Sequence, residues 1–508
     1  MDDRPASTWV PEPAQSDSSE TENMDPTITL DTLPEELILA ILSQIHTLST
    51  LANLALTNRR LHRLSLPPLY HTFPGRHSEL FLRTISHSPS LAAYTKVAIW
   101  QREPRTVSHI STLEKQHIIN RLNELCVPHG TDLAAQFAKF GKSEEYWYFE
   151  ILLLFCPNAE EVRVQESWLW DDHHYWFKSL SPFFNPLCVS KLRTVCIEGP
   201  MRIENIVPLL TIPTLRVLEV RQVTVMRREG YRVFQWSVWP VSRILPSRSS
   251  DLEVLTLRES YIDLELLIPI LERIKGLKRF TYEHMPNDLA DETVQVHHLN
   301  TRALAECLSM HAASLECIRV RDTESLDWML MAEYLFGHAP PDSNTQQTFP
   351  NLKTIDIGPA GIQGSPRSQF SSLLIEDIKP QMFPESLETL RIQPAFHIAG
   401  DSRPGAANAW ALQNMRCEVD FDHLLRAQAC NFAHENRRLK MQLVEWNPLL
   451  GWFPGNLPVL QQYFADVGLR LESITGEVFD FYDAEPLIMD EESEEGWVVV
   501  TDLLLATK

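Results

Sequence analysis

Apolar residues recur at helical spacing between residues 33 and 73. This pattern predicts a helix from Pro34 to Ile45, because a proline loses no hydrogen bond at the start of a helix and two glutamates follow at the positive end of the helix dipole. One stripe of this helix holds Leu37, Ile41 and Leu42, and an adjoining stripe holds Ile38 and Ile45. Docking on one neighbouring helix uses a single stripe, so the second stripe predicts a further partner.

Two more short helices follow this first one. We expect Ser49 to cap the first of them and Thr57 the second, and we expect the last helix to stop at Pro67 and Pro68. Three helices in about forty residues bury little surface. The segment is therefore predicted to gain stability from a bound protein or from the next domain.

From residue 159 onward, the pattern Leu-x-x-apolar-x-apolar recurs at intervals of 23 to 38 residues. In each unit, the first, fourth and sixth residues are predicted to point inward and to stack on the same positions of the next unit. The eight units begin at Ala159, Leu192, Leu215, Leu252, Leu277, Leu315, Leu352 and Leu387. The spacing predicts a repeat array, and the alternative is a set of unrelated buried strands in an α/β domain.

Helical patterns lie between these strands, at 203–210, 263–274 and 301–311, and we expect them on the convex side of the array. Before the array, the pattern predicts a helix and then a strand over 77–99, followed by helices over 112–156. After Leu390 the pattern weakens, and it predicts a helix running into a terminal strand over 421–445 and a further helix over 457–471.

The segment 33–73 closely resembles an F-box, the helical module that docks on the Skp adaptor of cullin-type ubiquitin ligases. The resemblance rests on the opening Leu-Pro, the central Leu-Ala-Leu, the following Asn-Arg-Arg and the closing Pro-Leu-Tyr. Thr57 departs slightly from the usual small apolar residue. The resemblance implies that Leu61, Leu64 and Leu69 hold the module together. It implies that the adaptor contacts Leu33, Pro34, Leu37, Ile41, Leu42, Leu51 and Leu54.

The repeat pattern resembles a degenerate leucine-rich repeat. The expected fold class is therefore α/β, with an N-terminal three-helix F-box followed by an irregular leucine-rich-repeat solenoid. The expected organisation is a disordered leader, the F-box, a substrate-binding repeat domain and an acidic C-terminal tail, over residues 1–26, 27–73, 77–476 and 477–508. The loose repeats and the acidic stretch are similar to F-box proteins of filamentous fungi.

Composition restricts the partners and the compartment. The net charge of −22 opposes binding to nucleic acid and to anionic membranes. Eight cysteines without paired spacing indicate a reducing compartment. The N-terminus lacks the positive charge of a signal peptide, and no apolar run is long enough for a membrane span. These observations predict a cytoplasmic or nuclear protein.

Potential metal ligands cluster in one segment, 168–177, which contains Asp171, Asp172, His173 and His174. Adjacent side chains rarely converge on one ion, so we expect no metal and no cofactor. The same segment and the insertion 226–240 are rich in aromatic residues, which are common interface anchors. We interpret Trp168, Trp170, Trp176 and Trp236 as candidate target-binding residues, and the alternative is that they pack under their own loops.

Arginines alternate with the inward residues of several units, and the candidates for target binding are Arg221, Arg258, Arg319 and Arg321. Such a face would suit an acidic or phosphorylated segment, although solvated charge explains each position singly.

No Gly-rich phosphate loop, nucleophile elbow or zinc-protease motif occurs, so the sequence does not indicate an enzyme. The resemblance implies a non-catalytic substrate receptor of a ubiquitin ligase, which binds the Skp adaptor, through it a cullin, and an unidentified target destined for degradation. One alternative is a non-proteolytic scaffold that binds the adaptor without cullin. Another is a hydrolase that uses residues 171–174 with a bound metal.

Overall fold

The fold is taken from a computed structural model of the full chain. The structure describes residues 30–73, 75, 78–101, 110–125, 133–135, 137–138, 146–165, 190–203, 206–224, 246–260, 262, 264–284, 301–322, 335, 349–360, 380, 383–394, 425–435, 439–444 and 457–474. The predicted disordered leader, 1–26, and the acidic tail, 477–508, lie outside the described residues.

Three helices form the N-terminal module, as the apolar spacing predicts. They are α1 (Glu35–Leu42), α2 (Leu48–Thr57) and α3 (Arg59–Leu69), and a short 3-10 turn, η1 (Leu30–Thr32), precedes them. The core of the module is built from one residue stripe of each helix, namely Ile38, Leu42, Leu51, Ala55, Leu61 and Leu64. Both α2 and α1 pack on α3, so α3 is the central helix of the module.

The helix ends differ from the sequence prediction. The α1 helix stops at Leu42, not at Ile45. The cap of α3 is Asn58 and not Thr57, because the Asn58 side chain accepts a hydrogen bond from the backbone N–H of Leu61 at 2.8 Å. Thr47, not Ser49, precedes α2.

The last turn of α3 contains Pro67 and Pro68, where the helix was predicted to stop. Each proline removes one backbone donor, but the turn is still closed by a hydrogen bond of 3.0 Å from the Tyr70 N–H to the Leu66 carbonyl. Leu69 and Tyr70 are fully buried. Burial of these two side chains therefore offsets the loss of two hydrogen bonds at the helix end.

The module is fused directly to the repeat array. After α3, the chain turns at Tyr70 and His71 and forms β1 (Thr72–Phe73), which pairs in parallel with β2 (Val97–Gln101). Phe73 and Tyr70 are buried against Phe81 of α4 (Ser78–His87), with ring centroids 4.8 Å and 5.9 Å apart. The two parts therefore share one hydrophobic core.

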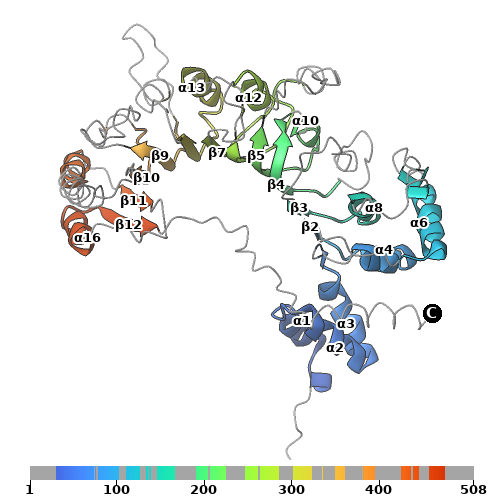
Figure 1. The fold of residues 1–508 in the computed structure, drawn as a ribbon. Helices are drawn as coiled ribbons and strands as arrows, with labels where there is room; N and C mark the ends of the chain where they lie inside the picture. The colour runs from blue at the N-terminus through green and yellow to red at the C-terminus, as the bar shows by residue number, and fades with distance from the viewer. Residues whose placement is uncertain are drawn as a thin grey trace, which may run out of the picture.

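The array is a single sheet of twelve parallel strands in chain order. Figure 1 shows it as an arc with helices on its outer side. All eight predicted repeat units contain a strand: β3 (Glu161–Gln165), β4 (Thr194–Arg202), β5 (Val217–Thr224), β6 (Val254–Ser260), β7 (Arg279–His284), β8 (Cys317–Asp322), β9 (Thr354–Ala360) and β10 (Thr389–Pro394). The predicted fold class, α/β with an N-terminal three-helix module followed by an irregular solenoid of the leucine-rich-repeat type, is confirmed.

The array continues further than the sequence pattern indicated. Strand β11 (Lys440–Val444) pairs with β10, and β12 (Arg470–Ile474) pairs with β11. The predicted terminal strand is therefore not terminal, and the predicted helix 457–471 ends at Asp466 as α16 (Leu457–Asp466). Two additional units extend the sheet beyond the point where the motif fades.

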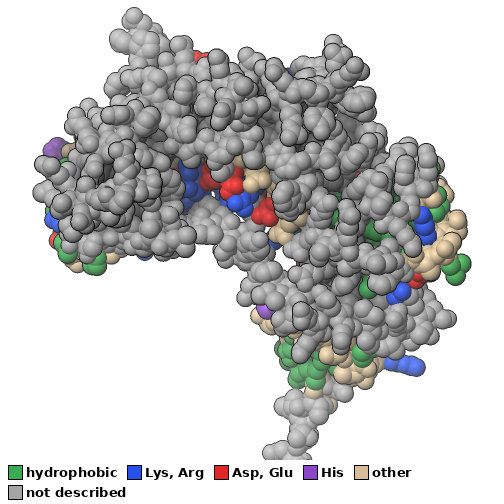
Figure 2. Space-filling view, viewed as in Figure 1, with side chains coloured by type: hydrophobic (Ala, Val, Ile, Leu, Met, Phe, Trp, Pro, Cys, Tyr) green, Lys and Arg blue, Asp and Glu red, His purple; other side chains and the backbone are tan. Residues whose placement is uncertain are grey.

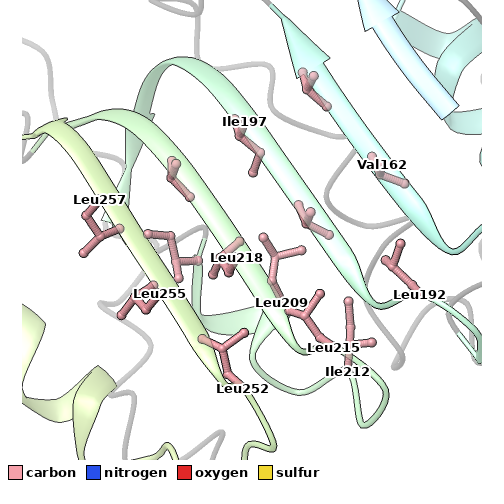
Figure 3. Close-up of a cluster of buried hydrophobic side chains, with 14 of the residues drawn as sticks. Val162, Leu192, Ile197, Leu209, Ile212, Leu215, Leu218, Leu252, Leu255 and Leu257 are labelled. Carbon is pink, nitrogen blue, oxygen red and sulfur yellow. The ribbon is translucent and has the colours of Figure 1, made fainter. Parts of the chain in front are cut away.

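The inward positions of the units stack in continuous rows, as predicted. In the unit that contains β4, Leu192, Val195 and Ile197 occupy the first, fourth and sixth positions, and all are buried. Figure 3 shows the same positions of β3, β5 and β6 beside them, together with Leu209 and Ile212 from the outer layer. Because each unit buries its apolar face on its neighbours, the array is stable only as a row.

Helices cover the outer side of the sheet (Figure 1). Toward the N-terminal end they are α5 (Pro89–Ala92), α6 (Thr112–Glu124) and α8 (Tyr146–Phe155). The three predicted convex helices are present as α10 (Ile206–Leu209), α12 (Leu264–Leu271) and α13 (Thr301–Ser309). A helix over residues 425–434 and α16 complete the layer.

Charged residues line the edge where the strands begin, and their sign alternates except at the neighbours Arg193 and Arg216. The amide of each edge residue donates to the carbonyl of the preceding one, and the row runs Lys96, Glu160, Arg193, Arg216, Glu253, Lys278, Glu316, Lys353 and Glu388. The ammonium of Lys278 lies 2.7 Å from a Glu253 carboxylate oxygen, and Lys96 lies 2.6 Å from Glu160. Each of these exposed pairs contributes little stability, because solvent screens it.

His311, just after α13, makes the outer layer sensitive to pH. Its side chain is buried, and its Nε2 lies 3.1 Å from the Leu271 carbonyl oxygen. Burial lowers the pKa of His311, and the charge of Arg248 acts in the same direction, whereas the hydrogen bond to Leu271 raises the pKa. The unfolded chain therefore takes up a proton at a higher pH than the folded protein does.

We expect His311 to reduce the free energy of unfolding as the pH falls below about 6.5, by up to about 1.4 kcal/mol per pH unit. Urea unfolding at pH 7.5 and 5.5 would measure this loss in the native protein and in His311→Gln. The loss should be smaller in the variant, whatever its stability at pH 7.5. An equal loss in both proteins would exclude His311 as the cause.

Candidate functional site

The N-terminal module exposes apolar side chains that a folded domain ordinarily buries. Leu37 and Ile41 of α1 are 52% and 43% exposed. Eight large hydrophobic residues of the described part are exposed, and four of them lie in α1 and α2. Figure 2 shows apolar side chains gathered on the outer end of the module, away from the array. An apolar surface of this kind favours a protein partner.

The candidate adaptor residues divide into three groups. Leu37, Ile41 and Pro34 are exposed. Leu33 and Leu54 are half-buried against the module core. Leu42 and Leu51 are only 2% and 3% exposed, so they lie in the core beneath the exposed side chains, and their place at or beside the adaptor interface stays a prediction. These two side chains point toward α3 and hold the three helices together.

Two exposed apolar residues were missed by the sequence reasoning, namely Leu39 and Leu56. At 100° per residue, Leu39 lies on the flank of α1 opposite Leu37 and Ile41, with the buried stripe between them. The signal was present in the sequence, because a helix as short as α1 with apolar residues on three sides has more apolar surface than one contact can cover.

Around the module, charged side chains fix the first loop. The guanidinium of Arg60 donates to the Leu33 carbonyl at 2.7 Å, and the carboxylate of Glu35 forms ion pairs with Arg63 and Arg60. The chain before α1 is thereby tied to α3, and the exposed residues of α1 are held on a defined surface.

The second candidate surface is the concave face of the sheet. Arg221 and Arg258 occupy paired positions on β5 and β6, beside Glu198 on β4. The Arg221 guanidinium lies 2.5 Å from a Glu259 oxygen and 3.9 Å from a Glu198 oxygen. Burial raises the pKa of Glu198, and the charge of Arg221 opposes this effect.

Three neighbouring strands bend at the same repeat position, directly after this charged row. Gly199, Gln222 and Glu259 all have positive φ angles, of 125°, 63° and 45°. The sheet register shifts next to them, as in a β-bulge. The unusual backbone of Glu259 turns its carboxylate toward Arg221, and strained positions of this kind are typical of functional surfaces.

Arg319 and Arg321 of β8 form the most buried charged cluster of the concave face. Both guanidiniums lie 3.0 Å from the same oxygen of Asp356 on β9, and Arg319 lies 3.4 Å from Glu283 on β7. Asp356 is only 1% exposed. The cluster contains two cations and two anions, so it is neutral as a unit.

Beside this cluster, the thiol of Cys317 lies among further arginines. Burial raises its pKa, and the charges of Arg391, Arg279 and Arg319 lower it.

Figure 2 shows acidic and basic side chains together in the hollow of the arc.

The structure thus brings Arg221, Arg258, Arg319 and Arg321 to one face, as expected. Three of them form ion pairs with acidic residues of neighbouring strands, which the sequence reasoning did not foresee. The aromatic candidates Trp168, Trp170, Trp176 and Trp236 lie outside the described residues, as does the cluster 171–174.

The part of the chain that the structure describes offers neither a metal site nor a membrane span. No group of three or more His, Cys, Asp or Glu residues there could hold a metal ion. No helix there is long and apolar enough to cross a membrane.

Comparison with known proteins identifies the N-terminal module. No curated protein matches this chain. Residues 30–73 match the F-box-like family model, and these residues include η1, all three helices and β1. The chain therefore contains an F-box-like domain that leads directly into a parallel α/β repeat array.

Proposed function

We propose that this protein is a substrate-recognition subunit of a Skp-cullin-F-box ubiquitin ligase. The observation that carries the proposal is the exposure of Leu37 and Ile41 within a segment that matches the F-box-like model. F-box domains bind an adaptor of the Skp type, so the exposed side of α1 is the docking surface for that adaptor. The adaptor in turn connects the protein to a cullin.

The repeat array supplies the second binding surface, its concave face, for a target protein. Such a subunit needs no catalytic residue of its own. It acts by proximity, because holding a target lysine near a ubiquitin-charged enzyme raises the effective concentration of the reactants. The charged rows on β5 to β9 belong to this target surface.

Co-purification of the full-length chain tests the proposal. We expect the tagged protein to recover a Skp adaptor and a cullin at comparable amounts under gentle conditions. Recovery of the adaptor without cullin would instead identify a non-proteolytic scaffold, and recovery of neither would contradict the proposal.

A further inference from the structure

We propose that the C-terminal half of the concave face, on strands β7 to β12, binds an extended acidic segment of the target protein. The inference rests on the proposed function, since it names the chemistry of the target for the same surface. It is carried by the distribution of charge over the sheet.

The two halves of the concave face differ in charge. On β3 to β6, three cations, Arg163, Arg221 and Arg258, face four anions, Glu161, Glu198, Glu219 and Glu259. On β7 to β12, six cations face three anions, which leaves a surplus of three positive charges. The cations are Arg279, Arg319, Arg321, Arg391, Lys440 and Arg470, and the anions are Glu283, Asp356 and Glu472.

The positive charge of this half of the concave face contrasts with the net charge of −22 of the whole chain. The negative charge elsewhere repels acidic molecules, so a local basic surface also selects where such a molecule binds.

Of these cations, Arg279 is the one best placed to form an ion pair with a bound molecule. Its side chain is exposed, and no carboxylate of the described residues lies within ion-pair distance of it. Its neighbours at the same register are the uncharged Val254 and Cys317. The charges of Arg319 and Arg321 are already neutralised by Glu283 and Asp356, so these side chains form a fixed polar surface next to Arg279.

The other end of the basic half also keeps an excess of positive charge. Lys440 and Arg470 share the single carboxylate of Glu472. Between the two ends, the guanidinium of Arg391 donates to the neutral amide of Gln442 at 2.8 Å. No acidic residue of the described sheet occupies a position between β9 and β12 on this face.

The spacing of the cations indicates a chain of carboxylates and not a single phosphate group. One phosphate is usually held by several donors that converge on it. Here the cations spread over six strands, which span roughly 24 Å at about 4.8 Å per strand, and an extended peptide crosses that distance in about seven residues. Alternate residues of such a peptide would place carboxylates on the basic side.

A fluorescein-labelled peptide of six Glu-Ser repeats tests the inference by fluorescence anisotropy on the full-length protein. We expect binding that weakens with added salt, and no binding of the matching Gln-Ser peptide. Arg279→Glu should weaken binding at least tenfold. Lys353→Glu makes the same charge change at the exposed strand-entrance edge and should change binding less than twofold.

Several results would overturn the inference. One such result is that Arg279→Glu and Lys353→Glu weaken binding of the Glu-Ser peptide equally. A second is that a peptide with one phosphoserine and no glutamate binds more tightly than the Glu-Ser peptide. A third is that the Glu-Ser peptide binds only after the acidic residues 490, 491, 492, 494 and 495 are replaced by their amides. The last result would identify the acidic stretch of the chain itself as the occupant.

Folding and the proposed function are checked separately. Arg279→Gln, which adds no negative charge, should weaken peptide binding in the same direction, and its urea midpoint should equal that of the native protein. Adaptor recovery should be unchanged by either Arg279 variant. If the peptide fails to bind while the adaptor is recovered, only the acidic-target inference is wrong.

Discussion

Replacing Leu37 by aspartate is expected to abolish recovery of the Skp adaptor while leaving the fold intact. Leu37 is 52% exposed in the isolated chain, so a carboxylate there remains hydrated and costs little stability. In the complex the same carboxylate would be buried without a partner, which costs several kcal/mol. Since about 1.4 kcal/mol corresponds to a tenfold loss of affinity, the expected loss is at least a hundredfold.

The matched control is Leu113→Asp. Leu113 is an exposed leucine in the first turn of α6, outside the F-box-like domain. Purified variants would be compared by titration with the adaptor and by thermal unfolding. Loss of adaptor binding in Leu37→Asp alone is the expected result, and tight binding by this variant would remove α1 from the docking surface.

Replacing Asp356 by alanine is expected to destabilise the array by about 3 kcal/mol or more. The carboxylate of Asp356 is buried between Arg319 and Arg321, and the side chain of Arg319 is buried as well. Removing one partner of a buried ion pair leaves a charge without compensation, which typically costs 3–5 kcal/mol. The free energy of unfolding in urea measures the effect.

A cross-strand pair at the strand-entrance edge gives the comparison. Lys353 and Glu388 are 3.7 Å apart on neighbouring strands, and both are exposed. Glu388→Ala should cost less than about 1 kcal/mol, because solvent screens an exposed pair. Similar losses in Asp356→Ala and Glu388→Ala would mean that burial of the concave cluster does not contribute to stability as described.

The strands of the array were predictable because each unit obeys one physical rule. A unit that presents apolar residues at its first, fourth and sixth positions can bury them only on its neighbours. All eight motif-bearing segments are strands, and residues such as Leu218, Leu255 and Ile355 are fully buried.

Strand β11 was predicted only as a terminal strand, and β12 begins where the predicted helix 457–471 was expected to end. In both segments the apolar residues are shifted relative to the motif. In the aligned register, Lys440 pairs with Thr389 and Arg470 pairs with Lys440. The buried Leu439 and Leu469 therefore stand one residue later than the first leucine of the motif. Pairing of β11 with β10 and of β12 with β11 places both segments in the sheet.

The candidate surfaces were predictable only in part. Alternation along each strand places Arg221 and Arg319 on the concave face, but it does not reveal their acidic partners. Those partners lie 23 to 38 residues away in the chain and meet the arginines through strand pairing. Similarly, the packing of three helices, and not the helical period alone, decides that Leu42 is buried and Leu37 is exposed.

The direct fusion of α3 to β1 has a geometric consequence. Since Tyr70 and Phe73 pack on Phe81, the helical module and the first repeat unit form one body without a flexible linker between them. In a repeat array, each unit adds a small, fixed rotation and translation. Each strand of the array therefore stands at a fixed distance and orientation from the helical module. In the proposed function, the strand to which a target binds sets the position of that target relative to the adaptor.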